Sequence, residues 1–191
     1  MKVITTLYKD SLPQKEEING VQIIRVRSKN RYSFTLFSLG VIFKYRRWPN
    51  LIHTTTYNAA IPSSIVGFMC QIPVTITVHE IWGKLWYKMP MLTLYERILY
   101  SLFESIVLKF PFNKYIGVSD YTYNSLIQRL PADKCVKILN GFPNKEKCNQ
   151  ATHNSSNIPE WLFYGRLGAS KGIDIFLDAL QILSEDKMWL S

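Results

Sequence analysis

The stretch Pro73-Val-Thr-Ile-Thr-Val-His79 has the pattern of a β-strand, and it decides the fold. A proline opens the stretch, β-branched residues fill it, and apolar and polar side chains alternate along it. A Trp-rich loop over residues 80–89 follows, and residues 92–110 then show an amphipathic helix pattern that includes Glu96, Arg97 and Glu104. A strand followed by a helix is half of a βαβ unit, so the stretch predicts a parallel sheet.

The same order of strand and helix recurs on both sides of this stretch. Residues 9–20 are polar and end in Asn19-Gly20, which is a turn signal. Asn58 is expected to cap one helix, and Ser119 or Asp120 another. The other expected strands are residues 2–6, 21–26, 51–53, 114–118 and 136–139, and the other expected helices are residues 33–47, 59–70 and 121–130. The sequence therefore predicts an α/β fold with a Rossmann-like parallel sheet, whose ligands bind at the carboxyl ends of the strands.

The chain is expected to comprise two domains. Residues 142–158 are rich in Asn, Ser and Lys and poor in apolar residues, so they are interpreted as a linker after a first domain over 1–141. The remaining residues, 159–191, begin with the apolar run Trp161–Tyr164 and continue with helix-spaced apolar residues at 173, 176, 177 and 180. This part is expected to be the first β-α unit of a second Rossmann-like domain.

Composition limits the kinds of partner. The chain has 191 residues, 47% of them apolar, and a formal net charge of +9. A positive charge of this size favours anionic partners, which include nucleic acids, nucleotides and anionic membrane surfaces. The three cysteines are far apart and show no metal-ligand spacing, so we expect no metal and a reduced, cytoplasmic location. No apolar run reaches the length of about 18 residues that a membrane span needs.

Two cations flank the turn that precedes the last helix. Arg166 ends the apolar run, and Lys171 stands directly before the helix. A helix N-terminus attracts anions through its free N–H groups and its dipole, and two full charges there suit a diphosphate. The alternative is a solvated helix start with two ordinary surface cations.

Four stretches together resemble the retaining glycosyltransferases of the GT-B fold, in family 4 of the sugar-nucleotide-dependent transferases. The stretches are His53-Thr-Thr-Thr-Tyr-Asn-Ala-Ala-Ile-Pro62, Thr77-Val-His-Glu80 with Ile-Trp-Gly83, Gly117-Val-Ser-Asp-Tyr-Thr122, and Ile138-Leu-Asn-Gly141 followed by Gly165-Arg-Leu to Lys171-Gly172. Each is weak alone, but their order and spacing are specific and cover nearly the whole chain. The resemblance implies transfer of a sugar from a nucleotide-sugar donor to a glycan or lipid-linked acceptor, with retention, in the synthesis of cell-envelope polysaccharide or glycolipid.

The resemblance also implies roles for individual residues. Arg166 and Lys171 would bind the donor diphosphate in place of a metal, so neither a metal nor a cofactor is expected beyond the donor substrate. His79 would be the catalytic-site residue that faces the donor sugar, although a histidine bonded to nearby backbone is the alternative. Glu80 would orient the imidazole of His79. Two further residues, His53 and Tyr57, would line the acceptor side of the cleft, where a structural role is equally open.

Ser119 is expected to be a helix cap close to the cleft.

The chain departs from the family pattern at both ends. It begins near what resembles the second strand, so the first strand and its glycine-rich loop are not matched. It stops before the acidic E-x7-E pair that binds the donor in family members. We therefore expect the amino-terminal domain without its first strand, and little transferase activity from these residues alone. Truncation, a split gene with a complementing chain that supplies the rest, and a degraded copy are the three alternatives.

Other functions stay open. A non-catalytic binding module that needs a partner chain is the main alternative to an enzyme. Nucleic-acid binding is not favoured, because the basic residues are scattered and match no nucleic-acid motif. The basic and aromatic stretches Phe43–Trp48 and Trp82–Lys88 suit peripheral attachment to the inner face of the cell membrane. The alternative for both stretches is a partly packed helix end and loop.

Overall fold

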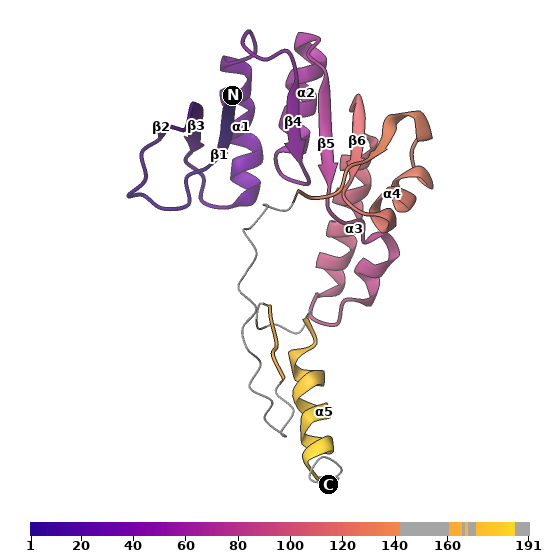
Figure 1. The fold of residues 1–191 in the computed structure, drawn as a ribbon. Helices are drawn as coiled ribbons and strands as arrows, with labels where there is room; N and C mark the ends of the chain where they lie inside the picture. Colours follow the sequence, from indigo (N-terminus) through magenta and orange to yellow (C-terminus); the bar gives the residue numbers. More distant parts are fainter. Residues whose placement is uncertain (142–160, 166, 168–170, 186–191) are drawn as a thin grey trace. The chain divides into compact units, whose positions relative to one another are not determined.

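The computed structural model describes residues 1–141, 161–165, 167 and 171–185 (Figure 1). Packing divides the chain into two units, Met1–Phe142 and Pro143–Ser191. The first unit contains two β-sheets and their helices, and the second contains one described helix.

A four-stranded sheet forms the centre of the first unit, with the strand order β4-β5-β6-β7. Its strands are β4 (Ile52–Thr55), β5 (Val74–Val78), β6 (Lys114–Gly117) and β7 (Cys135–Lys137), and every neighbouring pair is parallel. The connections run through α2 (Ala60–Cys70), α3 (Leu94–Lys109) and α4 (Asp120–Ile127). The predicted α/β, Rossmann-like parallel sheet is therefore confirmed. In Figure 1 the arrows of β4 and β5 point the same way.

The core lies against one face of this sheet. Val74, Ile76 and Val78 of β5 are at most 2% exposed, and they cluster with Val107 and with other residues of the three helices. Burying each of these side chains contributes about 1.5–3 kcal/mol to the free energy of unfolding, so β5 contributes strongly to the stability of the unit. The alternation of threonine with valine and isoleucine in the 73–79 stretch is the sequence cause of this one-sided burial, because successive strand residues face opposite sides of the sheet.

A second, three-stranded sheet has the order β1-β3-β2. Its strands are β1 (Lys2–Thr6), β2 (Lys15–Ile18) and β3 (Val21–Val26), with β1 parallel and β2 antiparallel to β3. The strand β2 was not expected, because Lys-Glu-Glu-Ile lacks the apolar alternation of a buried strand. It forms because the Asn19-Gly20 turn, with φ of 50° and 76°, folds the chain back onto β3.

Two caps were predicted in this unit, and the structure confirms one. The Ser119 hydroxyl accepts a hydrogen bond from the Thr122 N–H at 3.1 Å, and α4 begins at the next residue. Asn58 does not cap α2, because the chain turns one residue later and Ala59 takes the cap position without a side-chain bond. The Asn58 carbonyl instead accepts a hydrogen bond from Thr35 Oγ1 at 3.0 Å, which ties the loop after β4 to α1 (Arg31–Lys44).

The described part of the second unit consists of α5 (Ile173–Glu185) and the segment before it. The rings of Trp161 and Phe163 lie 6.3 Å and 6.1 Å from the ring of Phe176 in α5, whereas Leu162 and Tyr164 are more than nine-tenths exposed. Side chains therefore alternate between helix and solvent, as in a strand. The expected helix is confirmed. Residues 161–164, however, pair with no strand in the described part of the chain, so they lack the inter-strand hydrogen bonds that define a β-strand.

Candidate functional site

The carboxyl edge of the four-stranded sheet gathers most of the residues that the sequence singled out. Tyr57 follows β4, His79 and Glu80 follow β5, and Ser119 follows β6. Because all four strands are parallel, these strand ends lie along one edge. In open α/β sheets, ligands bind at this edge.

His79 is exposed at the end of β5, and its backbone is held by α4. The Thr122 hydroxyl donates a hydrogen bond to the His79 carbonyl at 3.2 Å, and the Thr122 N–H donates to the Ser119 hydroxyl at 3.1 Å. The first turn of α4 is thereby fixed next to the histidine. Within the described residues, the Glu80 carboxylate makes no hydrogen bond to the His79 imidazole, so the predicted orienting contact is not seen. The imidazole is accessible to a ligand.

A pocket of about 480 Å³ opens beside Glu80, and we call it the aromatic pocket. Its wall is mostly aromatic, with an amide, a carboxylate, three phenols and an indole N–H as the polar groups. The lining residues are Tyr32, Tyr57, Asn58, Glu80, Trp86, Leu99, Tyr100 and Phe103. An apolar cavity with a few converging polar groups is the usual form of a small-molecule site.

Glu104 of α3 holds one wall of the aromatic pocket in place. Its side chain is 3% exposed, and its carboxylate accepts hydrogen bonds from the N–H groups of Trp82 (2.9 Å) and Gly83 (2.8 Å). The indole N–H of Trp86 donates at 3.1 Å and the hydroxyl of Tyr57 at 3.3 Å. One carboxylate thus binds the loop after β5 to the loop after β4. In the sequence Glu104 is one of three charged residues of the amphipathic segment 92–110, and it shares a helix face with Arg97 and Ser101, so no local signal marks it as a site residue.

The phenol of Tyr57 is engaged with the protein. Its single O–H proton is shared between two acceptors, the Glu80 carbonyl oxygen at 3.1 Å and the Glu104 carboxylate at 3.3 Å. Burial raises the pKa of Tyr57 well above its ordinary value, and the nearby carboxylates of Glu104 and Glu80 add to the rise. The phenol is therefore neutral at pH 7 and acts as a hydrogen-bond donor, so it shapes the pocket and does not serve as a base.

His53 lies in β4, as the sequence predicted, and the strand continues beyond it. Its Nε2 is 2.8 Å from Thr77 Oγ1 on the neighbouring strand. The residue lines a separate groove along β4, described below, and not the aromatic pocket. The pairing shows that β4 is two residues longer at its carboxyl end than the sequence suggested, because Thr54 and Thr55 extend the ladder with β5.

The predicted diphosphate site falls in the second unit. Lys171 is exposed and stands two residues before the start of α5. Arg166 lies outside the described residues, so the juxtaposition of the two cations stays a prediction. In the part of the chain that the structure describes, no group of three or more His, Cys, Asp or Glu side chains is placed to hold a metal ion.

A scan of the sequence against protein-family models matches none, and a search of curated proteins finds no match. The function is therefore argued from the residues and their geometry.

Proposed function

We propose that this chain takes part in the transfer of a sugar from a nucleoside diphosphate sugar to a glycan or lipid-linked acceptor, with retention. The observation that carries the proposal is the carboxyl edge of the all-parallel sheet. An accessible histidine, His79, and the capped start of α4 lie along this edge with the aromatic pocket. The order of the motifs from His53 to Lys171 supports the same conclusion.

The proposed chemistry needs charge compensation for the departing diphosphate. In the proposal, Arg166 and Lys171 supply it without a metal, and one well-placed donor of this kind lowers a barrier by about 3–4 kcal/mol. His79 donates a hydrogen bond to the donor sugar or to the reacting phosphate. The aromatic pocket receives part of the acceptor, because aromatic walls with few polar groups suit an acceptor that has an apolar portion.

A non-catalytic binding module is the alternative from a different class of function. It shares the same edge and pocket but performs no transfer. Donor binding with measurable sugar transfer favours the enzyme, whereas donor binding without transfer, even with an added complementing chain, favours the module.

A titration of the full chain with a panel of nucleoside diphosphate sugars tests the proposal. We expect one donor to bind, and Lys171→Ala to weaken it by about tenfold, because a charge-assisted hydrogen bond to the diphosphate is lost. Isothermal titration calorimetry measures the dissociation constants. Lys109→Ala is the matched control, since Lys109 is an exposed lysine in the last turn of α3, and this variant should bind as the unmodified chain does.

Equal binding of all donors and of inorganic pyrophosphate would contradict the proposal. That result would mean that the net charge of +9 attracts anions without a built site.

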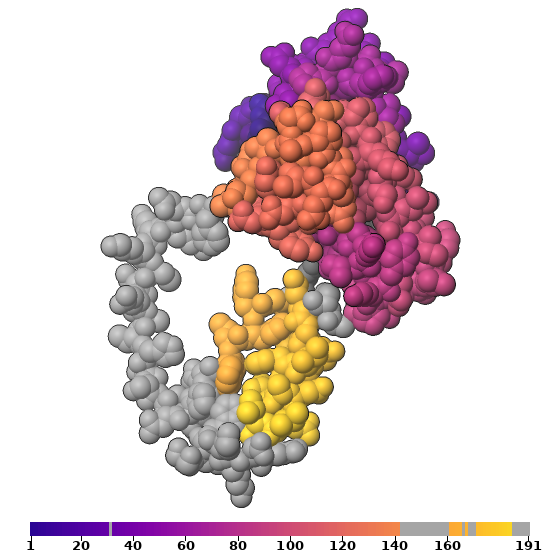
Figure 2. All heavy atoms as spheres, turned by 90° about the vertical axis from the view of Figure 1, so that its right-hand side faces the viewer, coloured from indigo at the N-terminus to yellow at the C-terminus, as the bar shows by residue number. Residues whose placement is uncertain are grey.

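An exposed apolar stripe on α3 supports a membrane-bound acceptor. Its residues follow helical spacing and are 37–74% exposed: Tyr95, Ile98, Leu99, Leu102 and Ile106. In Figure 2, α3 lies beside the η1 segment (Gly83–Lys88), which adds exposed Leu85 and Tyr87. Lys84 and Lys88 of η1 are also exposed. Apolar and aromatic side chains with lysines beside them favour a membrane interface with anionic headgroups.

The other basic and aromatic stretch, residues 43–48, is packed only in part: Tyr45 and Arg46 are half-buried, whereas Phe43, Lys44, Arg47 and Trp48 are exposed. The Arg46 guanidinium lies 4.2 Å from the Phe43 ring, and the Lys2 ammonium lies 4.9 Å from the Trp48 ring. The ring contact accounts for Arg46, whereas the exposed side chains of Lys44, Arg47 and Trp48 fit a membrane contact as well as a helix end. In the described part of the chain, no helix is both long and apolar enough to cross a bilayer.

Vesicle co-sedimentation tests the membrane surface. We expect the chain to bind vesicles that contain phosphatidylserine more strongly than vesicles of phosphatidylcholine alone, and Leu102→Glu to reduce this binding by about tenfold. Leu36→Glu is the control, because it puts the same charge on an exposed leucine of α1. Equal loss in both variants, or equal binding to both vesicle types, would count against this surface.

A further inference from the structure

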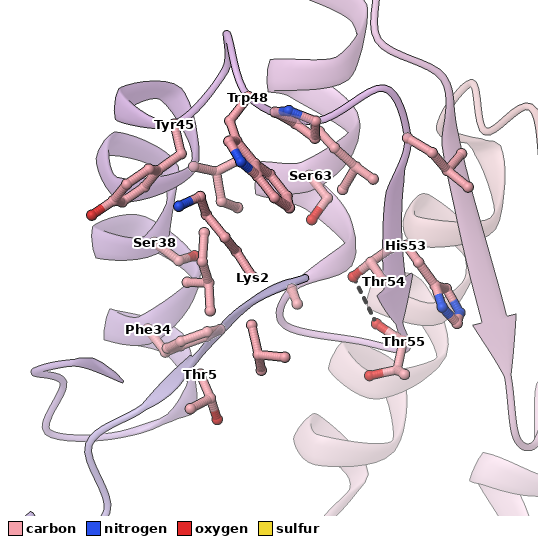
Figure 3. A pocket seen from close by; sticks show the side chains of 17 residues that line it. Lys2, Thr5, Phe34, Ser38, Tyr45, Trp48, His53, Thr54, Thr55 and Ser63 are labelled. Carbon is pink, nitrogen blue, oxygen red and sulfur yellow. Dashed lines mark hydrogen bonds between the residues drawn. The ribbon is translucent and has the colours of Figure 1, made fainter. Parts of the chain in front are cut away.

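The two sheets of the first unit end in free strand edges that lie on either side of a groove. Within residues 1–141, β1 pairs only with β3, and β4 pairs only with β5. The groove has a volume of about 340 Å³ and is lined by residues of both strands and of the helices α1 and α2. Figure 3 shows Lys2 and Thr5 on one side and His53 and Thr55 on the other, with both strands running the same way.

On the β1 side, a row of backbone groups points into the groove. The Gln22 N–H donates to the Met1 carbonyl at 3.0 Å, and the Leu7 N–H donates to the Val26 carbonyl at 2.9 Å. Odd-numbered residues of β1 therefore bond to β3. Because successive backbone groups of a strand point to opposite sides, the N–H and C=O groups of Ile4 and its even-numbered neighbours face the groove.

On the β4 side, the even-numbered residues bond to the neighbouring strand β5, and the odd-numbered residues face the groove. The Ile52 N–H donates to the Pro73 carbonyl at 2.9 Å, and the Thr56 N–H donates to the Thr77 carbonyl at 3.1 Å. The backbone groups of His53 and Thr55 consequently face the groove. The Thr55 carbonyl accepts only a long hydrogen bond of 3.3 Å from the Thr54 hydroxyl. Two parallel rows of backbone donors and acceptors thus face one another across the groove.

The floor of the groove is apolar or small. Phe34 and Ile42 of α1 supply apolar surface, and Ser38 and Ser63, at 0% and 4% exposure, supply small side chains. A floor of this kind accommodates apolar side chains that project from an extended segment above it. The other face of such a segment would stand beside Thr5 and Thr55, so polar β-branched residues suit it.

We propose that this groove is a strand-acceptor site that binds an extended, apolar segment of a partner polypeptide as a β-strand parallel to both β1 and β4. The inserted strand bonds to both rows of backbone groups and joins the two sheets into one, in the order β2-β3-β1, inserted strand, β4-β5-β6-β7. The backbone pattern carries the proposal, because two parallel edges specify an extended polypeptide and its direction. A small ligand would not use both rows.

A synthetic peptide tests this site in the full chain. The probe is acetyl-Glu-Val-Thr-Val-Thr-Val-Lys-amide with a fluorescent label, which alternates apolar and polar β-branched residues and carries a charge at each end. We expect saturable binding by fluorescence anisotropy. Hydrogen exchange should show new protection at the amides of Ile4, His53 and Thr55, which face the groove, because only a strand bonded to both edges protects both sets.

Two controls isolate the backbone contacts. The same peptide with N-methylated central residues keeps its side chains but loses its donors, and it should bind at least tenfold more weakly to the unmodified chain. Thr55→Pro removes a donor from the β4 edge and should weaken binding by a similar factor, while Thr55→Val keeps the donor and the shape and should bind normally. The N-methylated peptide keeps the test valid if Thr55→Pro does not fold.

Two results would overturn the proposal. One is a folded, monomeric chain that binds neither peptide, or binds both equally. The other is a chain that self-associates through this groove, with Thr55→Pro restoring the monomer, because the occupant would then be a second copy and not a partner segment.

Discussion

Glu104→Ala is expected to lower the free energy of unfolding by about 3–5 kcal/mol, because a buried carboxylate that accepts several hydrogen bonds is removed. The N–H groups of Trp82 and Gly83 and the indole N–H of Trp86 would lose an acceptor that is itself only 3% exposed. Urea denaturation followed by tryptophan fluorescence measures the loss, and it also reports on the two tryptophans beside the site.

Two further variants distinguish the loss of the Glu104 hydrogen bonds from a general effect of mutating α3. Glu104→Gln keeps the shape but turns an amide donor towards other donors, so it should fall between the alanine variant and the unmodified chain. Ser105→Ala changes an exposed neighbour on the same helix and should alter the unfolding free energy by no more than about 0.5 kcal/mol. A loss of less than about 1 kcal/mol in Glu104→Ala would show that the carboxylate does not hold the loop.

Gly67→Ala is expected to lower the free energy of unfolding by about 2–3 kcal/mol, since the added methyl group overpacks the contact between α2 and β5. A Cβ at this position would lie 2.1 Å from Cγ2 of Val74 and 2.9 Å from the Ile72 carbonyl oxygen. Val74 is 2% exposed and has little room to move. Thermal or urea denaturation measures the effect.

Gly40→Ala is the matched control, because Gly40 also lies within a helix, and it should have the opposite sign. Apart from its chain neighbours and the backbone of its own helix, no atom lies within 4 Å of an added Cβ there, so the gain in helix propensity remains, about 0.5–1 kcal/mol of stabilisation. If both glycines responded alike, close packing at Gly67 would not be the cause.

The sequence predicted the parallel sheet because its strands have simple signals. The 73–79 stretch alternates valine and isoleucine with threonine, and the structure buries the apolar set. Ser119 has a hydroxyl suited to a helix start, and it caps α4 as predicted. These features are local, so composition and spacing over a few residues are enough to predict them.

The misses have tertiary causes. The β2 strand is polar and forms only because β3 is available as a partner. Asn58 has a suitable side chain for a cap, but the hydrogen bond from the Thr35 hydroxyl to the Asn58 carbonyl fixes the position of the loop, and the helix begins one residue later. Glu104 becomes a site-shaping residue only when Tyr57 and Trp86, from distant parts of the chain, meet it.

By itself the sequence determined the order of strands and helices, and hence which strand ends carry His79 and Ser119, because these depend on periodicity and on caps within each segment. Only the tertiary structure decided that Glu104 organises the aromatic pocket and that β1 and β4 flank a groove with free backbone edges. Hydrogen-bond partners that are far apart in the chain are chosen by packing, and no spacing of residues along the sequence encodes them.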